Sequence, residues 1–233
     1  MKMIFASLCI AMTMSLFPFK GEFGNLCDSI DIMLLSSGRI QYLDYKDEHG
    51  ISYRTGAVLI DASPETVWGI LEDIENLGSV LTHIEYYRIR HGSTDQEKGD
   101  ILLEGRFVIP DFPAQFTLAM EFDRTGKWRK WHVMSAEETA SFNKKGIGVL
   151  PSGGLIKDMA GFEYLEPFED GKKTVYYYAM NITSTIPIPE FIKNNIHDAV
   201  YARHMGMIRD MAESFAENPE EKVIECSGDS DGT

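Results

Sequence analysis

The sequence predicts an α+β fold in which a curved antiparallel sheet wraps around one long C-terminal helix. Short segments of alternating apolar and polar residues follow one another through the second half of the chain, separated by tight turns, as in antiparallel sheets. After them, apolar residues recur at helical spacing over 189–216. A run of strands followed by a helix favours α+β over a wound parallel sheet, in which strands and helices alternate.

The composition excludes several classes of protein. The 233 residues carry 22 Lys and Arg against 36 Asp and Glu, a formal net charge of −14, whereas binding to nucleic acid or to anionic lipid needs a basic surface. The apolar share of 44% and the aromatic share of 11% exclude a mainly disordered chain. Three cysteines are too few for a disulfide scaffold or an all-cysteine zinc site. An acidic domain with a large core remains.

The N-terminus is typical of an export signal. Lys2 precedes an apolar run from Met3 to Phe17, which is shorter than the roughly 20 residues of a membrane-spanning helix. We therefore expect a signal peptide over 1–20, a periplasmic or secreted protein, and no stable membrane span after cleavage. The alternative is a short membrane anchor or a buried helix.

The remaining chain divides into three parts. We expect an N-terminal arm over 21–35, a single domain over 36–216 and a disordered acidic tail over 217–233. Export would permit a disulfide between Cys27 and Cys226, which would tie the arm to the tail. The alternative is two thiols on separate ends.

The first half of the domain is predicted to contain strands and then helices. The strands are expected over Arg39–Tyr45, from Gly50 to Tyr53, and over Gly56–Asp61. Ser63 and Pro64 suit the N-cap and the first position of a helix, and residues 74–83 form a second short helix or a loop.

Six strands are predicted after these helices. They are expected over 85–91, 100–109, 115–123, 128–135, 155–168 and 173–185. Residues 136–153 are expected to be a loop, either a flap beside a cavity mouth or a plain surface loop. The final helix, about 40 Å long at 1.5 Å per residue, is expected to turn one apolar face to the sheet, formed by Ile192, Ile196, Val200, Met207, Met211 and Phe215.

Several segments resemble the START-related polyketide cyclase/dehydratase superfamily, also called SRPBCC. The resemblance rests on Gly56–Trp68, on Asp73 with Ile84–Tyr86, on Gly161–Pro167, on Thr174–Tyr178 and on Ile186–Ile192. It implies the helix-grip fold and an exported bacterial member. Proteins of this superfamily bind lipids, sterols, hormones or polyketides in a cavity, and some cyclise or dehydrate the ligand. They share the cavity and not a catalytic signature.

No motif for covalent or cofactor chemistry is present. The chain lacks a phosphate-binding glycine loop, an HExxH pair and a Gly-x-Ser-x-Gly elbow, so we assign no cofactor, no metal and no catalytic residue. His204, Tyr164 and Tyr178 are the polar candidates in the cavity, with packing as the alternative role for each. The predicted ligand-binding wall consists of Phe116, Leu118, Met120, Trp131, Tyr164, Tyr178, Ile196, Val200, His204 and Met207.

Two functions are compatible with these residues. The first is an exported binding or carrier protein that holds a lipid or another hydrophobic small molecule. The second is a cyclase/dehydratase-type enzyme that uses the same cavity, with His204 and Tyr178 as acid or base. A domain with a collapsed cavity that acts as an interaction module is a third reading.

Overall fold

The structure, a computed structural model, describes residues 26–47, 50–81, 84–107, 114–152, 156–185 and 190–217, with side chains from His197 onward in the last range. The predicted signal peptide, Cys226 and all but the first residue of the predicted acidic tail lie outside these ranges. Export, the disulfide and the division of the chain into parts therefore stay predictions.

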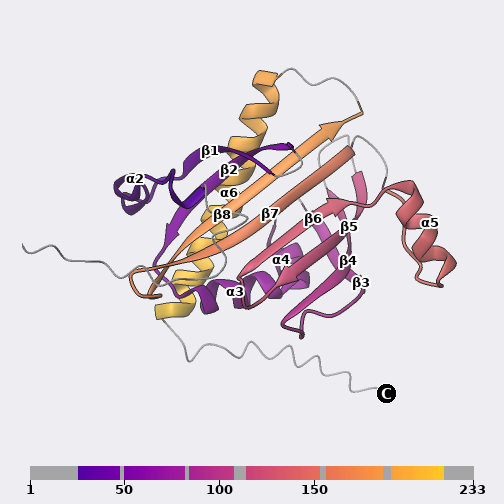
Figure 1. The fold of residues 1–233 in the computed structure, drawn as a ribbon, viewed down its shortest axis with the longest axis horizontal. Helices are drawn as coiled ribbons and strands as arrows, with labels where there is room; N and C mark the ends of the chain where they lie inside the picture. Colours follow the sequence, from indigo (N-terminus) through magenta and orange to yellow (C-terminus); the bar gives the residue numbers. More distant parts are fainter. Residues whose placement is uncertain are drawn as a thin grey trace, which may run out of the picture.

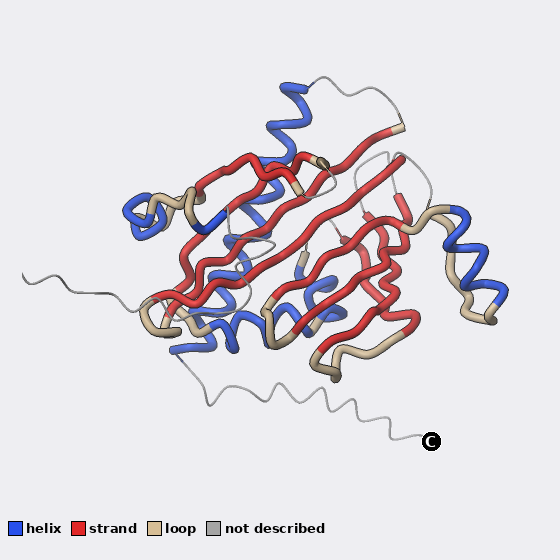
Figure 2. Tube along the Cα trace, in the orientation of Figure 1, coloured by secondary structure: helices blue, strands red, loops and turns tan. Residues whose placement is uncertain are grey.

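Eight antiparallel strands form one sheet in the order β1-β2-β8-β7-β6-β5-β4-β3 (Figures 1 and 2). The strands are β1 Gln41–Lys46, β2 Ser52–Ile60, β3 Ile84–His91, β4 Lys98–Phe107, β5 Ala114–Asp123, β6 Trp128–Val133, β7 Ile156–Phe168 and β8 Lys173–Ser184. The helices are α2 Ile32–Ser36, α3 Pro64–Glu72, α4 Ile74–Val80, α5 Ala136–Lys144 and α6 Glu190–Glu217. Helices α3, α4 and α6 lie on one face of the sheet, here called the inner face (Figure 1). The predicted α+β fold with one long C-terminal helix is confirmed.

Local sequence signals explain the two helices that lie between β2 and β3. The side chain of Ser63 accepts a hydrogen bond from the backbone N–H of Thr66, and Pro64 occupies the first position of α3. Asp73 ends α3 and caps α4 through Asn76. These helices carry the chain from β2, beside one edge of the sheet, to the opposite edge at β3, from which β4, β5 and β6 return strand by strand.

The first predicted strand pair differs from the structure in one respect. The segments expected at Gly50–Tyr53 and Gly56–Asp61 are parts of a single strand, β2, which pairs with β1 and β8. Gly56 does not end a strand; it lets α6 approach the sheet, because a Cβ atom there would lie 2.6 Å from Met205 Sδ. Tyr201 fixes the same crossing: its hydroxyl accepts from the backbone N–H of Met180 at 2.7 Å and lies 2.7 Å from the carbonyl oxygen of Arg54.

Gly56→Val is expected to lower the free energy of unfolding by about 1–3 kcal/mol, because added methyl groups overpack a filled contact between α6 and β2. Denaturant unfolding measures the change. Gly69→Ala in α3 is the control, since a Cβ atom there meets no other group within 4 Å. The control should be neutral or stabilising by up to about 1 kcal/mol. Wild-type stability of Gly56→Val would contradict a tight contact at this point.

The buried face of α6 is turned by about one residue from the predicted one, which corresponds to about 100° on a helix. Tyr201, Met205, Ile208 and Ala212 are completely buried. The predicted residues Val200, Met207, Met211 and Phe215 are only partly buried at the edge of this contact. The predicted face was chosen by its large apolar side chains. Tyr201 and Ala212 form much of the buried contact instead. Among the described residues, no helix is long and apolar enough to span a membrane.

The sequence predicts a loop over residues 136–153, but the structure has helix α5 in the first half of this segment. Ser135 caps α5 in a complete capping box with Glu138, a Ser-x-x-Glu signal that the glycines and lysines further on obscured. The following segment is fixed to β5, because the hydroxyl of Thr117 donates to the carbonyl of Leu150 at 2.8 Å. Because Thr117 faces away from α6, this arrangement does not support a flap beside the cavity mouth.

A second apolar cluster lies on the outer face of the sheet. Leu26 and Leu35, from the predicted N-terminal arm, pack there with Tyr45, Phe162 and Tyr177. Tyr45 meets the ring of Phe162 edge-on at 5.3 Å between centroids. The arm therefore shields one half of a face that would otherwise expose aromatic side chains.

Candidate functional site

Most of the predicted wall residues come together on the inner face. Five of them belong to the main buried cluster, namely Phe116, Leu118, Met120, Trp131 and Tyr178. The ring of Tyr178 lies 6.0 Å from Trp131 and 4.4 Å from His204 of α6, so the strands and the helix meet at an aromatic contact. Val200 and Met207 are partly buried against the same cluster.

Tyr164 does not belong to this wall, and its predicted position is wrong. It stacks on Tyr177 in the outer cluster, with ring centroids 5.6 Å apart. In β7 both faces are buried, so the aromatic pair Phe162 and Tyr164 gave no guide to which face is the inner one. Ile196 lies in α6, but its side chain is outside the described residues.

Four polar side chains meet beneath α6 in the centre of the inner face. Arg129 of β6 forms an ion pair with Glu163 of β7, and both are buried, with exposures of 8% and 1%. The hydroxyl of Tyr176 donates to Glu163 Oε1 at 2.6 Å, and His204 Nε2 lies 3.1 Å from the same oxygen. We call these four residues the central polar cluster.

The hydrogen bonds of this cluster fix the position of its protons. The carboxylate of Glu163 can only accept, and the single hydroxyl hydrogen of Tyr176 is directed at it. His204 Nε2 is also 3.0 Å from the Tyr176 oxygen, so this nitrogen carries a hydrogen that it donates. The geometry therefore leaves Nδ1 as the ring atom of His204 that remains for other contacts.

The cluster is strongly polarised. Burial by itself would raise the pKa of the Glu163 carboxyl, but Arg129 and the hydrogen bond from His204 outweigh it and lower that pKa to about 2. Burial raises the pKa of the Tyr176 hydroxyl well above its usual value, and the charge of Glu163 raises it further. At neutral pH the cluster thus holds a carboxylate, a guanidinium and a neutral phenol.

Arg129 also connects the cluster to α3. Its Nη1 donates to the backbone carbonyl of Leu71, near the end of that helix. The cluster thereby joins α3, β6, β7, β8 and α6 through hydrogen bonds, and its first structural role is to hold the helices on the sheet.

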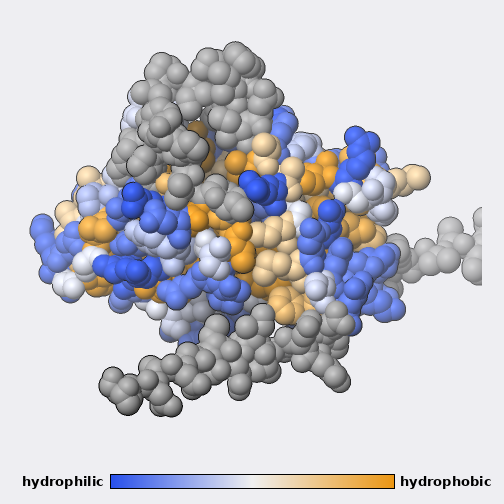
Figure 3. Space-filling view, turned by 180° about the vertical axis from the view of Figure 1, so that it is seen from behind, coloured by the Kyte–Doolittle hydropathy of each residue, from blue (hydrophilic) through white to orange (hydrophobic). Residues whose placement is uncertain are grey.

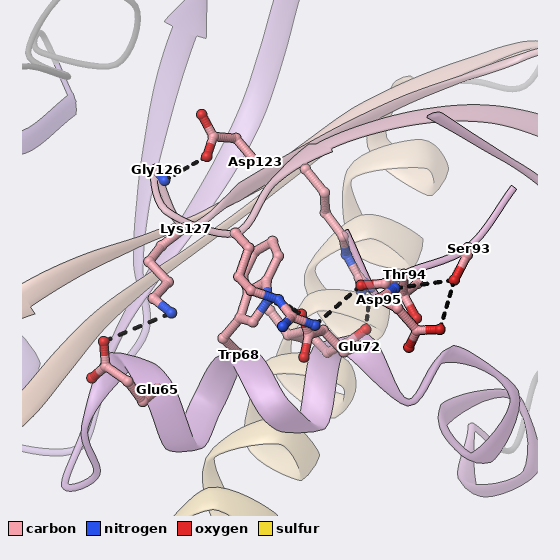
Figure 4. A network of polar contacts seen from close by, with 12 residues as sticks. Glu65, Trp68, Glu72, Ser93, Thr94, Asp95, Asp123, Gly126 and Lys127 are labelled. Atoms are coloured by element: carbon pink, nitrogen blue, oxygen red, sulfur yellow. Dashed lines mark hydrogen bonds and ion pairs between the residues drawn. The ribbon is translucent and has the colours of Figure 1, made fainter. Parts of the chain in front are cut away.

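Beyond the cluster, towards α3, the interior is closed. Trp68 donates its indole N–H to Glu72, which also accepts from Arg124 Nε at 2.6 Å (Figure 4). Arg124 Nη2 reaches the carbonyl of Thr94 at 3.1 Å, so α3 is tied to two turns of the sheet. The hollow left beside Trp68 and Arg129 has a volume of about 10 Å³, which is room for about one water molecule.

At the opposite end of the wall, several apolar side chains keep part of their surface accessible. Phe107, Ile156, Ile182 and Val200 lie there and are only partly buried against the main cluster. Figure 3 shows the helical side of the molecule, on which apolar surface gathers between two hydrophilic flanks. We call this end the mouth. From the mouth inward, the wall changes from apolar side chains to aromatic ones and then to the central polar cluster.

Sequence reasoning missed Arg129 and Glu163. Arg129 shares its side of β6 with Trp131 and Val133, so the alternation of the strand already placed it on the inner face. Glu163 lies between Phe162 and Tyr164, and the signal for its position was weaker. Its two neighbours on the same face are Gly161 and Leu165. A buried arginine requires a carboxylate nearby, and this requirement would have pointed to a partner such as Glu163.

Comparisons with protein-family models and with curated proteins found no match for this chain. Solved structures do match. A STAR-related lipid transfer protein from Xanthomonas axonopodis is 14% identical, with a TM-score of 0.51 over 73% of this chain and 98% of that one. The Zhui aromatase/cyclase from Streptomyces sp. R1128 is 10% identical, with a TM-score of 0.50 over 77% of this chain and 94% of that one.

A third structure, the di-domain ARO/CYC BexL from the BE-7585A biosynthetic pathway, is 12% identical, with a TM-score of 0.50 over 71% of this chain. This chain spans about half of that protein, 48%. At such low identities the likeness concerns the fold alone. The chain therefore has a START-like helix-grip fold, as its sequence predicts.

Proposed function

We propose that this protein binds and carries a hydrophobic small molecule or lipid between the sheet and α6. The observation that supports the proposal is the continuous apolar wall of the inner face, whose residues at the mouth keep accessible surface. The hollow beside Trp68 has room for about one water molecule, so we place the ligand nearer to the mouth. The structures named above, a lipid transfer protein and aromatase/cyclases, share the fold and agree with this choice.

Export is part of the same proposal. Lys2 and the apolar run after it support a periplasmic or secreted protein, and hydrophobic molecules outside the cytosol need a carrier to cross water. N-terminal sequencing of the protein recovered from the producing cell tests export. A mature chain that begins near residue 20 supports it, and an intact Met1 in the cytosol contradicts it.

Mass spectrometry of organic extracts of the purified native protein tests the carrier. A hydrophobic compound that co-purifies in roughly stoichiometric amount is expected. Trp131→Arg should lose that compound, because a buried charge in the wall disfavours apolar contact. Asp170→Arg, in the turn between β7 and β8, is a surface control that should keep it. Repeated absence of any compound, together with no uptake of fluorescent fatty acids or sterols, would contradict the proposal.

A cyclase/dehydratase-type enzyme is the second candidate. The observation that favours it is the position of His204 between Tyr176 and Tyr178, with Glu163 fixing one ring nitrogen. Turnover of a polyketide-like substrate that disappears in His204→Ala and survives in Tyr164→Phe would support it. Undiminished turnover in His204→Ala would remove the proposed acid or base.

A further inference from the structure

Two phenol groups inside the grip lack a strong hydrogen-bond partner. The hydroxyl of Tyr178 contacts only the sulfur of Met180 at 3.5 Å, and sulfur is a weak acceptor. The hydroxyl of Tyr87 makes no hydrogen bond with another described residue. A hydroxyl in the wall whose donor the protein does not use well can donate to a bound molecule, so both groups are candidates for contact with a ligand.

Both phenols belong to the inner wall. Tyr87 of β3 meets Phe116 edge-on at 6.3 Å between ring centroids. Tyr178 of β8 packs on Trp131 and His204. The contact with His204 brings Tyr178 to the central polar cluster, whereas Tyr87 lies on the same inner face towards the edge strand β3. The charges of Glu163 and Arg129 act on both hydroxyl groups.

The phenols are neutral donors at physiological pH. Burial raises the pKa of Tyr87 and that of Tyr178 above the usual value for tyrosine. A neutral phenol donates one hydrogen bond. A carbonyl or hydroxyl oxygen of a ligand can accept it.

The charge of the central polar cluster is already used. Arg129 pairs with Glu163 and donates to the carbonyl of Leu71. Among the described residues of the cluster, no other arginine or lysine is left to neutralise a carboxylate, and Glu163 would repel one. Burying an unpaired carboxylate there is costly, so this environment selects against fatty acids and other anions.

We propose that the ligand is a neutral hydrophobic molecule with a carbonyl or hydroxyl oxygen, which Tyr87 and Tyr178 bind at the inner end of the site. The oxygen lies beside the central polar cluster, and the hydrocarbon part extends along Phe116 and Leu118 towards the mouth. This inference rests on the proposed carrier function and narrows its ligand class from hydrophobic molecules in general to neutral ones with an accepting oxygen.

The test compares three probes of equal carbon number with the purified protein at neutral pH: a long-chain methyl ketone, the fatty acid and the n-alkane. Displacement of a fluorescent apolar dye reports each affinity. The ketone is expected to bind at least about 10-fold more tightly than the fatty acid. It should bind about threefold to 10-fold more tightly than the alkane, which corresponds to one net hydrogen bond.

Two variants locate the effect. Tyr87→Phe and Tyr178→Phe should each weaken ketone binding by about threefold to 10-fold and leave alkane binding unchanged. Tyr164→Phe is the matched control, because it removes the same hydroxyl from the outer face and should change neither affinity. Both variants remove an oxygen without a strong partner, so we expect them to fold, and circular dichroism checks this.

The outcomes separate the two proposals. Equal or tighter binding of the fatty acid, or ketone binding that both variants leave unchanged, overturns the neutral-oxygen inference while the carrier function stands. Failure of all three probes to displace the dye counts against the carrier function itself and removes the basis of the inference.

Discussion

Replacing Arg129 with methionine is expected to lower the free energy of unfolding by about 3–5 kcal/mol at neutral pH. The change leaves the Glu163 carboxylate, which is 1% exposed, without its cation inside the protein. It also removes the donor that the carbonyl of Leu71 uses. Methionine fills a similar volume, so the expected loss comes from the uncompensated charge and the broken hydrogen bonds rather than from a cavity.

Denaturant unfolding of two further variants separates these effects. Arg106→Met breaks the ion pair with Glu85, whose members are 43% and 47% exposed, and should cost less than about 1 kcal/mol. The double variant Arg129→Met with Glu163→Leu removes both buried charges and should recover a large part of the loss, because apolar replacements of buried pairs are often neutral. Equal costs for Arg129→Met and Arg106→Met would show that the cluster does not hold a buried charge.

The fold was predictable because its signals are local and repeated. Period-two alternation, hairpin turns and the cap at Ser63 place α3 and the strands correctly, apart from the division of β2 into two. The wall residues Phe116, Leu118 and Met120 followed from the same alternation, since a strand buried on one face marks that face by its apolar side chains.

The remaining part of the site was not predictable from alternation alone. The long strand β7 is buried on both faces, so Tyr164 and Glu163 carry no sign of which side meets α6. Only a three-dimensional arrangement brings Glu163 of one strand, Arg129 of the next and His204 of a distant helix together. The difference between the predicted and the observed buried face of α6 also depends on a contact between distant segments. Gly56 of β2 allows a close approach of α6, and the residues of α6 that meet it are Tyr201 and Met205.

The same buried pair should make the protein lose stability in acid. The folded-state pKa of Glu163 is about 2, whereas an unfolded glutamate has a pKa of about 4.3. A depressed folded-state pKa adds stability that is fully present above the unfolded value and disappears as the pH falls through the folded one. The shift corresponds to about 3 kcal/mol, lost between about pH 5 and pH 2.

The free energy of unfolding measured against pH for the wild type and Glu163→Gln checks this expectation. The glutamine variant has no proton to gain, so its stability should fall less steeply over the same window, while it starts from a lower value at neutral pH because Arg129 loses its counter-ion. If the variant does not fold, the carboxyl carbon resonance of Glu163 in the wild type gives the answer directly. A midpoint near pH 2 agrees with an ion pair that holds α6, β7 and α3 together, and a midpoint near 4.3 would mean that the carboxylate gains nothing from Arg129 and His204.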